Sequence, residues 1–278
     1  MRTSEIPVAI SYSMGSSSEW LVRAMLRGTL PRPEHVVVIC ADTKAEHGWS
    51  YAARAEVEQA CRDAGVTFIG CQADTSLEAD MLALAGDHEA SSMRADHPPF
   101  WIAKGSGRGR AQHRCTRFYK VAPMRRAVSS WLEVIDKPKL VERWIGFSAD
   151  EAHRATKAVS AQDVAWERLR FPAIERGLVR GQLRADLVTW TGRAPRFSMC
   201  VFCPFKSPRR WRDTSAADLA RAIAVDEAIR DLDCVGLTDG PAYLSDRLIP
   251  VADLVRHGDP QPTLPGLESY CDSGACFL

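Results

Sequence analysis

Apolar runs of strand length alternate with helically spaced apolar residues through the first part of the chain. The first run ends in a polar turn, and apolar residues from Trp20 to Met25 then recur three and four positions apart. This alternation predicts an α/β fold, with a mostly parallel sheet flanked by helices. The strands are expected at residues 7–11, 35–41 and 66–71, and a second helix at residues 51–64, where Gly65 is expected to end it.

The pattern changes after the third expected strand. Residues 86–118 combine glycine, proline and arginine without periodicity, which indicates a long irregular segment. A helix is expected at residues 121–134 and a further strand at residues 140–147. Ser215 and Asp218 form a capping pattern that opens another helix, whereas residues 256–267 are expected to be extended.

Composition excludes several classes of protein. The 278 residues are 46% hydrophobic and 26% charged, which suits an ordinary soluble core. No apolar run approaches the length of a membrane span, and the first residues lack the apolar core of a signal peptide. We therefore expect a cytoplasmic protein without a membrane partner. In a reducing compartment, nine cysteines indicate metal or redox sites and core residues, and not a disulfide framework.

A hydroxyl-rich turn follows the first expected strand. The segment from Ser11 to Ser18 holds five serines and one glycine, and a helix follows it. The first backbone amides of a helix bind phosphate well. Serine-rich turns are also common simply because serine caps helices, so both interpretations stay open here.

Three cysteines are candidates for a metal or redox site. Cys200 and Cys203 form a C-x-x-C pair followed by proline, and Cys115 lies in a stretch from Lys104 to Arg126 with eight basic and no acidic residues. That basic stretch is typical of a solvated charge run, a nucleic-acid arm or an anion site. Because Cys115 is expected to begin a helix, its thiol pKa is expected to be lowered.

The C-x-x-C pair alone fits a zinc half-site, a redox dithiol or an iron–sulfur half-site. Zinc needs two further ligands. Cys271 and Cys276, near the end of the chain, are the candidates for that role. They are also candidates for a nucleophile or a sulfur carrier.

Together these motifs resemble the PP-loop ATP pyrophosphatases and the phosphoadenylylsulfate (PAPS) reductases of the adenine nucleotide alpha-hydrolase superfamily. The serine turn is similar to their S-x-S-G-G-x-D-S loop, although Met14 and Ser17 depart from it. Cys115 begins a stretch similar to their C-T-x-x-x-K-x-x-P motif. The remaining matches are Asp42, Thr43 and Glu46 after the second strand, Arg154 in a G-I-x-x-x-E-x-x-R motif, and the C-x-x-C-P element.

The resemblance implies a Rossmann-like nucleotide-binding domain at residues 1–160 and a cysteine-containing extension at residues 161–278. It implies an adenine nucleotide, ATP with Mg²⁺, on the serine loop. It also implies an iron–sulfur cluster, [4Fe-4S] in type, with zinc as the rival. The implied nucleotide-binding residues are Ser11, Ser13, Gly15, Ser16, Ser18, Asp42 and Arg154; the catalytic ones are Arg117, Lys120 and Cys276; the metal ligands are Cys115, Cys200, Cys203 and Cys271.

Three functions are compatible with this resemblance. The first is an ATP-dependent sulfurtransferase that adenylates an oxygen of its acceptor, releases pyrophosphate and then lets sulfur displace AMP. DNA, tRNA or a small molecule would be the acceptor, and a cysteine desulfurase or a thioredoxin-like protein the donor. The second is a PAPS or adenylylsulfate reductase with a C-terminal cysteine nucleophile. The third is a non-catalytic nucleotide- or nucleic-acid-binding module with structural zinc.

Overall fold

A parallel sheet forms the centre of the computed structural model, which describes residues 6–83, 98–104, 107–111, 115–232 and 240–259. Five strands run in the order β3-β2-β1-β6-β7, and every neighbouring pair is parallel. The expected α/β fold class is thereby confirmed. The strands are β1 (Val8–Tyr12), β2 (Val36–Asp42), β3 (Thr67–Gln72), β6 (Val141–Ile145) and β7 (Glu167–Arg170).

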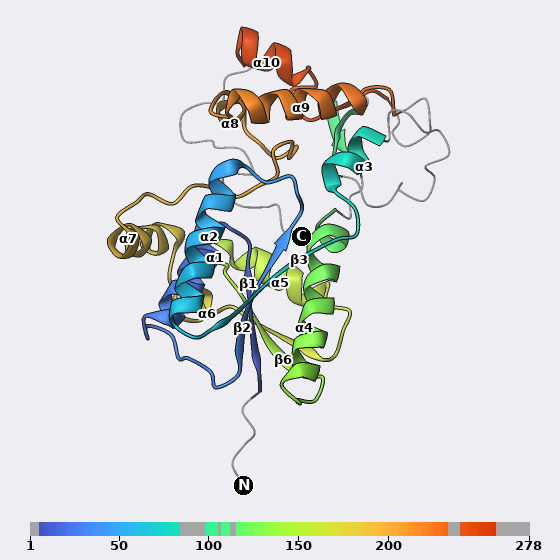
Figure 1. Ribbon diagram of the computed structural model, residues 1–278. Coiled ribbons are helices and arrows are strands. Elements are labelled where there is room, and N and C mark those ends of the chain that lie inside the picture. The colour runs from blue at the N-terminus through green and yellow to red at the C-terminus, as the bar shows by residue number, and fades with distance from the viewer. Residues whose placement is uncertain (1–5, 84–97, 105–106, 112–114, 233–239, 260–278) are drawn as a thin grey trace.

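Helices cover both faces of this sheet (Figure 1). Alternate strand residues point to opposite faces, and Ile10 and Val38 pack in one core while Ala9 and Val37 pack in another. The first core also contains side chains of α1, α2, α6 and α7, and the second those of α4. The helices are α1 (Ser16–Leu26), α2 (Gly48–Asp63) and α7 (Arg180–Thr191) on one face and α4 (Ala122–Val134) on the other.

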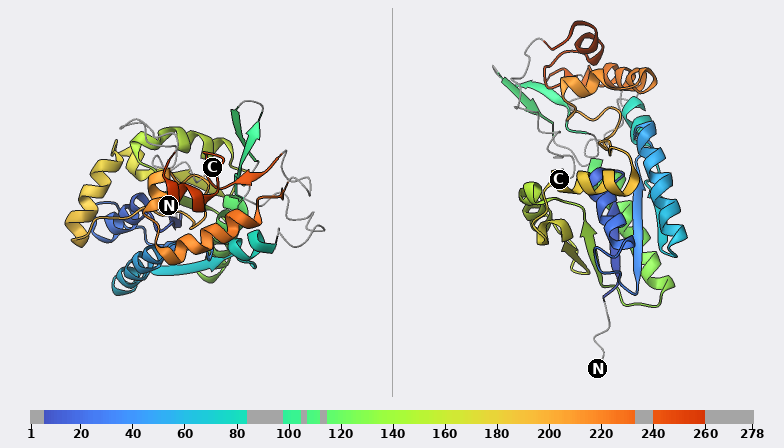
Figure 2. Two further views of the ribbon diagram at one scale, coloured as in Figure 1. Left: turned by 90° about the horizontal axis from the view of Figure 1, so that it is seen from above. Right: turned by 90° about the vertical axis from the view of Figure 1, so that its left-hand side faces the viewer.

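A third core lies beyond the carboxyl ends of the strands (Figures 1 and 2). It joins an antiparallel three-stranded sheet, in the order β5-β4-β8, to the short helices of the chain's last part. The elements there are α3 (Leu77–Ala83), β4 (Trp101–Lys104), β5 (Gly107–Arg110), α8 (Pro208–Arg212), α9 (Ala216–Ala228), β8 (Ala242–Tyr243) and α10 (Val251–His257). The remaining elements are η2 (Arg117–Val121), η3 (Ala149–Glu151), α5 (Ala152–Ser160) and α6 (Pro172–Glu175).

Two sequence expectations need correction. The segment expected to be irregular contains the β4–β5 hairpin, because Ile102 is buried and the indole of Trp101 donates to the carbonyl of Pro204 at 2.7 Å. These tertiary contacts outweigh the weak strand propensity of a glycine-rich sequence. The tail expected to be extended from Arg256 begins inside α10, which ends at His257.

β7, the last strand of the parallel sheet, follows residue 160, and the domain boundary expected there stays a prediction. Two local expectations are confirmed. Gly65 has a positive φ of 63° directly after α2, and the hydroxyl of Ser215 accepts from the amide of Asp218 at the start of α9. No helix among the described residues is long and apolar enough to cross a membrane.

Gly146 allows β6 to approach the first turn of α1 closely. A Cβ atom at this position would lie 2.7 Å from backbone atoms of Ser17 and Ser18. Backbone atoms cannot swing aside as the end of a side chain can. Position 146 therefore requires glycine. The close contact there holds the serine turn against the end of β6.

We predict that Gly146→Ala lowers the free energy of unfolding by about 1–3 kcal/mol, the usual effect of overpacking. Urea denaturation measures this change. Gly181→Ala in α7 is the matched control, because a Cβ atom there meets nothing within 4 Å. In a helix that control is expected to stabilise by about 0.5–1 kcal/mol. Equal stability of the two variants would contradict the close approach.

Candidate functional site

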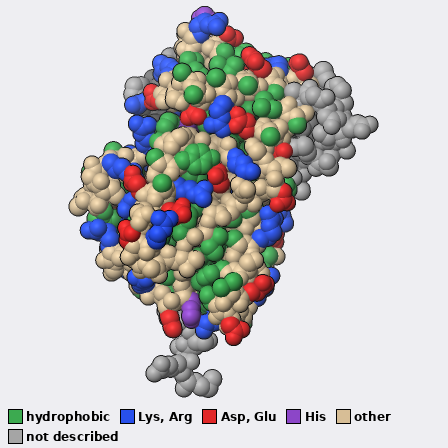
Figure 3. Space-filling model, viewed as in Figure 1, with side chains coloured by type: hydrophobic (Ala, Val, Ile, Leu, Met, Phe, Trp, Pro, Cys, Tyr) green, Lys and Arg blue, Asp and Glu red, His purple; other side chains and the backbone are tan. Residues whose placement is uncertain are grey.

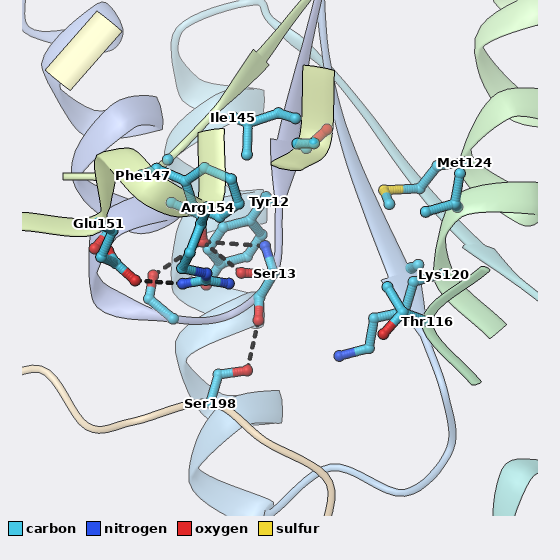
Figure 4. A pocket seen from close by; sticks show the side chains of 18 of the residues that line it. Tyr12, Ser13, Thr116, Lys120, Met124, Ile145, Phe147, Glu151, Arg154 and Ser198 are labelled. Carbon is cyan, nitrogen blue, oxygen red and sulfur yellow. Dashed lines mark hydrogen bonds and ion pairs between the residues drawn. The ribbon is translucent and has the colours of Figure 1, made fainter. Parts of the chain in front are cut away.

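A cavity of about 570 Å³ lies at the carboxyl end of the sheet. The order of strands reverses between β1 and β6, and residues that follow both strands line the cavity. Such a reversal is the usual ligand site of an open parallel sheet. Figure 4 shows Arg154, Glu151 and Phe147 on one side of this cavity and Lys120, Thr116 and Met124 on the other.

Positive charge gathers in this cavity. On the face in Figure 3, cationic and anionic side chains are interspersed, in keeping with the net charge of +1. The cavity wall, in contrast, has eight cationic and three acidic residues. The cationic residues are Arg117, Lys120, Arg125, Arg143, Arg154, Arg180, Arg184 and Arg210, and the acidic ones are Glu151, Asp163 and Glu167.

Each of the three carboxylates is shared by two arginines. Asp163 accepts from Arg117 and Arg125 at 2.8 and 2.6 Å, and Glu167 accepts from Arg125 and Arg143 at 3.0 and 2.8 Å. The third carboxylate, Glu151, pairs with Arg154 and Arg180. Five arginines therefore share three carboxylates. The surplus of positive charge favours an anionic ligand.

Glu151 organises the opposite wall. It accepts hydrogen bonds from the hydroxyl of Ser148, at 2.8 Å, and from Arg154. Arg180 approaches the same carboxylate at 3.0 Å. The guanidinium of Arg154 also lies 4.3 Å from the ring centre of Phe147. Arg154 is therefore a buried residue that its ion pair with Glu151 holds in the wall.

The serine turn lines the cavity as predicted, and all five of its candidate residues do so. The hydroxyl of Ser18 accepts from the amide of Ser13 at 3.1 Å and lies 3.0 Å from the Gly15 carbonyl, to which it donates. Met14 has a φ of 60°, a left-handed conformation that is rare for a side chain of this size. Because α1 begins at Ser16, the amides of its first turn are at the cavity wall.

Arg143 links the serine turn to the charged wall. Its Nε donates to the hydroxyl of Ser11 at 2.8 Å, and its Nη1 donates to Glu167. Burial lowers the pKa of the Arg143 guanidinium, and the neighbouring Glu167 raises it. Sequence reasoning missed Arg125, Arg143 and their carboxylates. The sequence signal for Arg143 was a charged residue at a core-facing position of the strand expected at residues 140–147.

The turn after β2 lies beside the cavity. Asp42 accepts from the hydroxyl of Tyr51 at 2.9 Å and from Arg54 at 3.2 Å, and it is not among the described residues that line the cavity. Its expected contact with the nucleoside stays a prediction. Glu46 is buried and accepts from Lys120 at 3.1 Å and from Thr43 at 3.4 Å.

The three candidate cysteines line one small pocket. Cys115, Cys200 and Cys203 surround a space of about 40 Å³, and this pocket shares part of its wall with the larger cavity. The shared residues are Thr116, Lys120, Ser198 and Met199. The structure therefore brings Cys115 and the C-x-x-C pair together beside the cationic cavity, and their role as metal ligands stays a prediction.

The chain positions these thiols through backbone contacts. Cys115 is the first described residue of a helical segment, and Cys200 forms an isolated antiparallel bridge with Glu46. The amide of Val201 donates to the carbonyl of Ala45 at 2.6 Å, and the amide of Cys203 donates to the carbonyl of Cys200 at 3.1 Å.

The expected lowering of the Cys115 pKa is wrong. Burial and the neighbouring Cys203 together raise the pKa of this thiol to about 12. Burial and the carboxylate of Glu46 also raise the pKa of Cys200 strongly. Desolvation outweighs the helix amides, because the thiolate loses more water than the helix end replaces. Without a cation among them, these thiols stay protonated at neutral pH.

The described residues contain no group of three or more His, Cys, Asp or Glu side chains positioned to hold one metal ion. Cys271 and Cys276 lie outside the described residues, so their expected roles stay predictions. Cys40 and Cys61 are buried, as expected of core residues. The three clustered thiols fit a thiolate-bound group that spans several metal atoms, because each cysteine of an iron–sulfur cluster binds a different iron.

A buried polar group lies behind the C-x-x-C turn. His47 Nδ1 lies 2.7 Å from a carboxylate oxygen of Asp218, and the His47 ring stacks on Trp49 at 4.0 Å. The ammonium of Lys206 is buried and donates to the carbonyl of Val201 at 2.5 Å. Sequence reasoning missed this group, since its members are far apart in the chain.

Comparison with known proteins adds one structural likeness. No family model matches the chain, and no curated protein matches it. Among solved structures, the chain is similar to the U34-tRNA thiolase NcsA from Methanococcus maripaludis with its [4Fe-4S] cluster. The two are 10% identical, the match covers 93% of this chain and 83% of that chain, and the TM-score is 0.39.

We predict that protonation of His47 lowers the free energy of unfolding as the pH falls. Burial and the nearby Lys206 together lower the pKa of His47 from 6.5 to about 4, although the hydrogen bond to Asp218 acts in the opposite direction. A lowered pKa means that protonation favours the unfolded chain. Its contribution is complete above pH 6.5 and is lost as the pH falls to about 4. At about 1.4 kcal/mol per pKa unit, the loss is about 3 kcal/mol.

Urea denaturation of the wild type and His47→Gln from pH 7 to pH 4 measures this loss. The difference in free energy of unfolding between the two proteins is expected to narrow over that range. The exposed His153 supplies the control variant, His153→Gln, whose difference from wild type is expected to stay constant. A constant difference for His47→Gln would contradict a neutral buried imidazole.

Proposed function

We propose that this protein is an ATP pyrophosphatase that activates an acceptor for sulfur transfer. The observation that carries the proposal is the wall common to the cationic cavity and the cysteine pocket. Thr116, Lys120, Ser198 and Met199 belong to both. A nucleotide-activated group in the cavity would lie next to the sulfur chemistry of the thiols. Neither pocket alone would call for this reaction.

The cavity suits an adenine nucleotide with its phosphates on the serine turn. Its volume of about 570 Å³ falls within the range of small-molecule sites, roughly 300–1,000 Å³. The first amides of α1 and the hydroxyls of Ser11, Ser13, Ser16 and Ser18 would bind the β- and γ-phosphates. Apolar side chains such as Met124 and Ile145 offer a surface for the base.

In the proposed first step, an acceptor oxygen attacks the α-phosphorus of ATP, and the bond to the bridging oxygen of pyrophosphate breaks. Pyrophosphate leaves with that electron pair. Negative charge grows on the leaving group, where Arg143 and the serine turn would stabilise it. In the second step, a sulfur nucleophile at the oxidation level of sulfide attacks the activated carbon, a C–S bond forms, and the C–O bond to AMP breaks.

Lys120 has the central role in this proposal. It is the one cationic residue in the wall common to both pockets, and its ammonium is mostly buried beside Glu46. From there it would neutralise charge on the AMP leaving group while facing the thiols. Arg154, on the opposite wall, would orient the phosphates through its fixed guanidinium.

Cys115, Cys200 and Cys203 would hold an iron–sulfur cluster at the shared wall. The donor set fits, because three thiols line one pocket and burial disfavours the thiolates of Cys115 and Cys200 unless a cationic group is beside them. When bound, such a cluster supplies a site for inorganic sulfur or for electrons. The rival is a zinc ion on Cys200, Cys203, Cys271 and Cys276, and the last two lie outside the described residues.

We predict that anaerobically purified protein is brown and holds about four iron and four sulfide atoms per chain, as a [4Fe-4S] cluster requires. Cys115→Ser, Cys200→Ser and Cys203→Ser are each expected to lose this iron. Cys61→Ser is the matched control, because Cys61 is buried in α2 away from the pocket and is expected to keep iron. A colourless protein with stoichiometric zinc would overturn the cluster.

We also predict that the protein releases pyrophosphate from ATP when its acceptor is present, and that Lys120→Met lowers kcat about 100-fold, as loss of one transition-state donor does. A coupled pyrophosphatase assay with bulk nucleic acid as the trial acceptor measures this. Lys157→Met in α5 is the control, because Lys157 is exposed, and its rate is expected to equal that of the wild type.

Two results would redirect the assignment. Thioredoxin-dependent release of sulfite from PAPS, without pyrophosphate release from ATP, would support a reductase that uses Cys271 or Cys276. Nucleotide or nucleic-acid binding without either reaction would support the non-catalytic module. In that case the basic residues around Cys115 would be the main functional surface.

A further inference from the structure

The segment from Phe197 to Cys203 is attached to the serine turn by one side chain. The hydroxyl of Ser198 donates to the carbonyl of Ser13 at 2.6 Å (Figure 4). The two chains are also close here, since a Cβ atom added at Gly15 would lie 3.4 Å from the Cβ of Ser198. A displacement of the Ser13 carbonyl would therefore also displace the Ser198 side chain.

The same segment is attached at its other end to the turn after β2. Cys200 pairs with Glu46, and the amide of Val201 donates to the carbonyl of Ala45 at 2.6 Å. The Thr43 hydroxyl lies 3.7 Å from the Cys200 sulfur. One residue, Met199, separates Ser198 from Cys200, so there is little chain in which a displacement could be absorbed.

The serine turn holds hydrogen bonds that an anion must replace. The amide of Ser13 donates to the Ser18 hydroxyl at 3.1 Å, and the hydroxyls of Ser13 and Ser18 lie 3.0 Å apart. A phosphate group on this turn would compete for that amide and for both hydroxyls. Binding an anion therefore changes the hydrogen bonding of the Ser13 amide, and the carbonyl of the same residue, in the next peptide group, accepts from Ser198.

We propose that Ser198 is a positioning residue that couples an anion on the serine turn to the C-x-x-C turn. An anion that fixes Ser13 in place also fixes the segment that carries Cys200, because the Ser198 hydroxyl is hydrogen-bonded to Ser13. The inference rests on the proposed function only in that the serine turn binds pyrophosphate. Its consequence is that the thiols are held in place most firmly when the nucleotide's phosphates are bound.

Hydrogen–deuterium exchange on the full chain, with and without pyrophosphate, tests this coupling. Exchange requires local opening, and a ligand that stabilises the closed form slows it. In the wild type, pyrophosphate is expected to slow exchange in residues 15–19 and in residues 199–203. The slowing in the second segment should be about fivefold or more, the low end of coupling between sites.

In Ser198→Ala, slowing in residues 15–19 is expected to persist, while slowing in residues 199–203 is lost. Ser207→Ala is the matched control. Ser207 accepts from the amide of Arg210 at the start of α8, and the hydrogen bonds of its hydroxyl do not include the serine turn. This variant is expected to behave as the wild type does. A purely structural role of Ser198 would raise exchange equally with and without pyrophosphate.

The outcomes separate the two hypotheses. If pyrophosphate slows both segments in Ser198→Ala as in the wild type, the coupling through Ser198 is wrong and the pyrophosphate site stands. The same holds if pyrophosphate slows residues 15–19 alone in the wild type. If pyrophosphate slows neither segment in the wild type, the serine turn does not bind it, and the coupling and the proposed function both fail.

Discussion

The attachment of the C-x-x-C segment to two neighbouring strand ends is the constraint on which the site depends. Through Ser198 the segment contacts the turn after β1, and through Val201 it contacts the turn after β2. Since β1 and β2 are adjacent in a parallel sheet, their carboxyl ends lie at one edge. A segment distant in sequence is thereby fixed beside the cavity, and the thiols become part of its wall.

The balance of charges in the cavity wall explains why the cavity favours an anionic ligand. A buried ion pair is stable only if its partners satisfy each other, and removal of one partner leaves an uncompensated charge. In the cavity, Asp163 and Glu167 each serve two arginines, and Glu151 serves a further two. Because Glu151, Glu167, Arg143 and Arg154 are buried, this sharing keeps the guanidinium groups of Arg143 and Arg154 in place and still leaves positive charge for an anion. The cavity is organised before its ligand arrives.

Much of the fold could be predicted from sequence, because strand and helix periodicities are local. The parallel strands and the capped start of α9 follow from neighbouring residues. The β4–β5 hairpin could not be predicted, since Trp101 is held by the carbonyl of Pro204, far along the chain. Among site residues, the serine turn and the three cysteines carry motifs, whereas Arg143 and His47 gain their roles only through burial and distant partners.

The Cys115 thiol shows how burial changes the chemistry that a motif suggests. At the start of a helix in a basic stretch, a thiol is expected to ionise easily. Packing against the third core removes water, and the neighbouring Cys203 also disfavours the thiolate, so the pKa rises to about 12. A reactive free thiolate is therefore disfavoured at this position. The same desolvation strengthens the attraction between thiolates and a bound cation, so the pocket is better suited to holding a metal-containing group than to attack by a free cysteine.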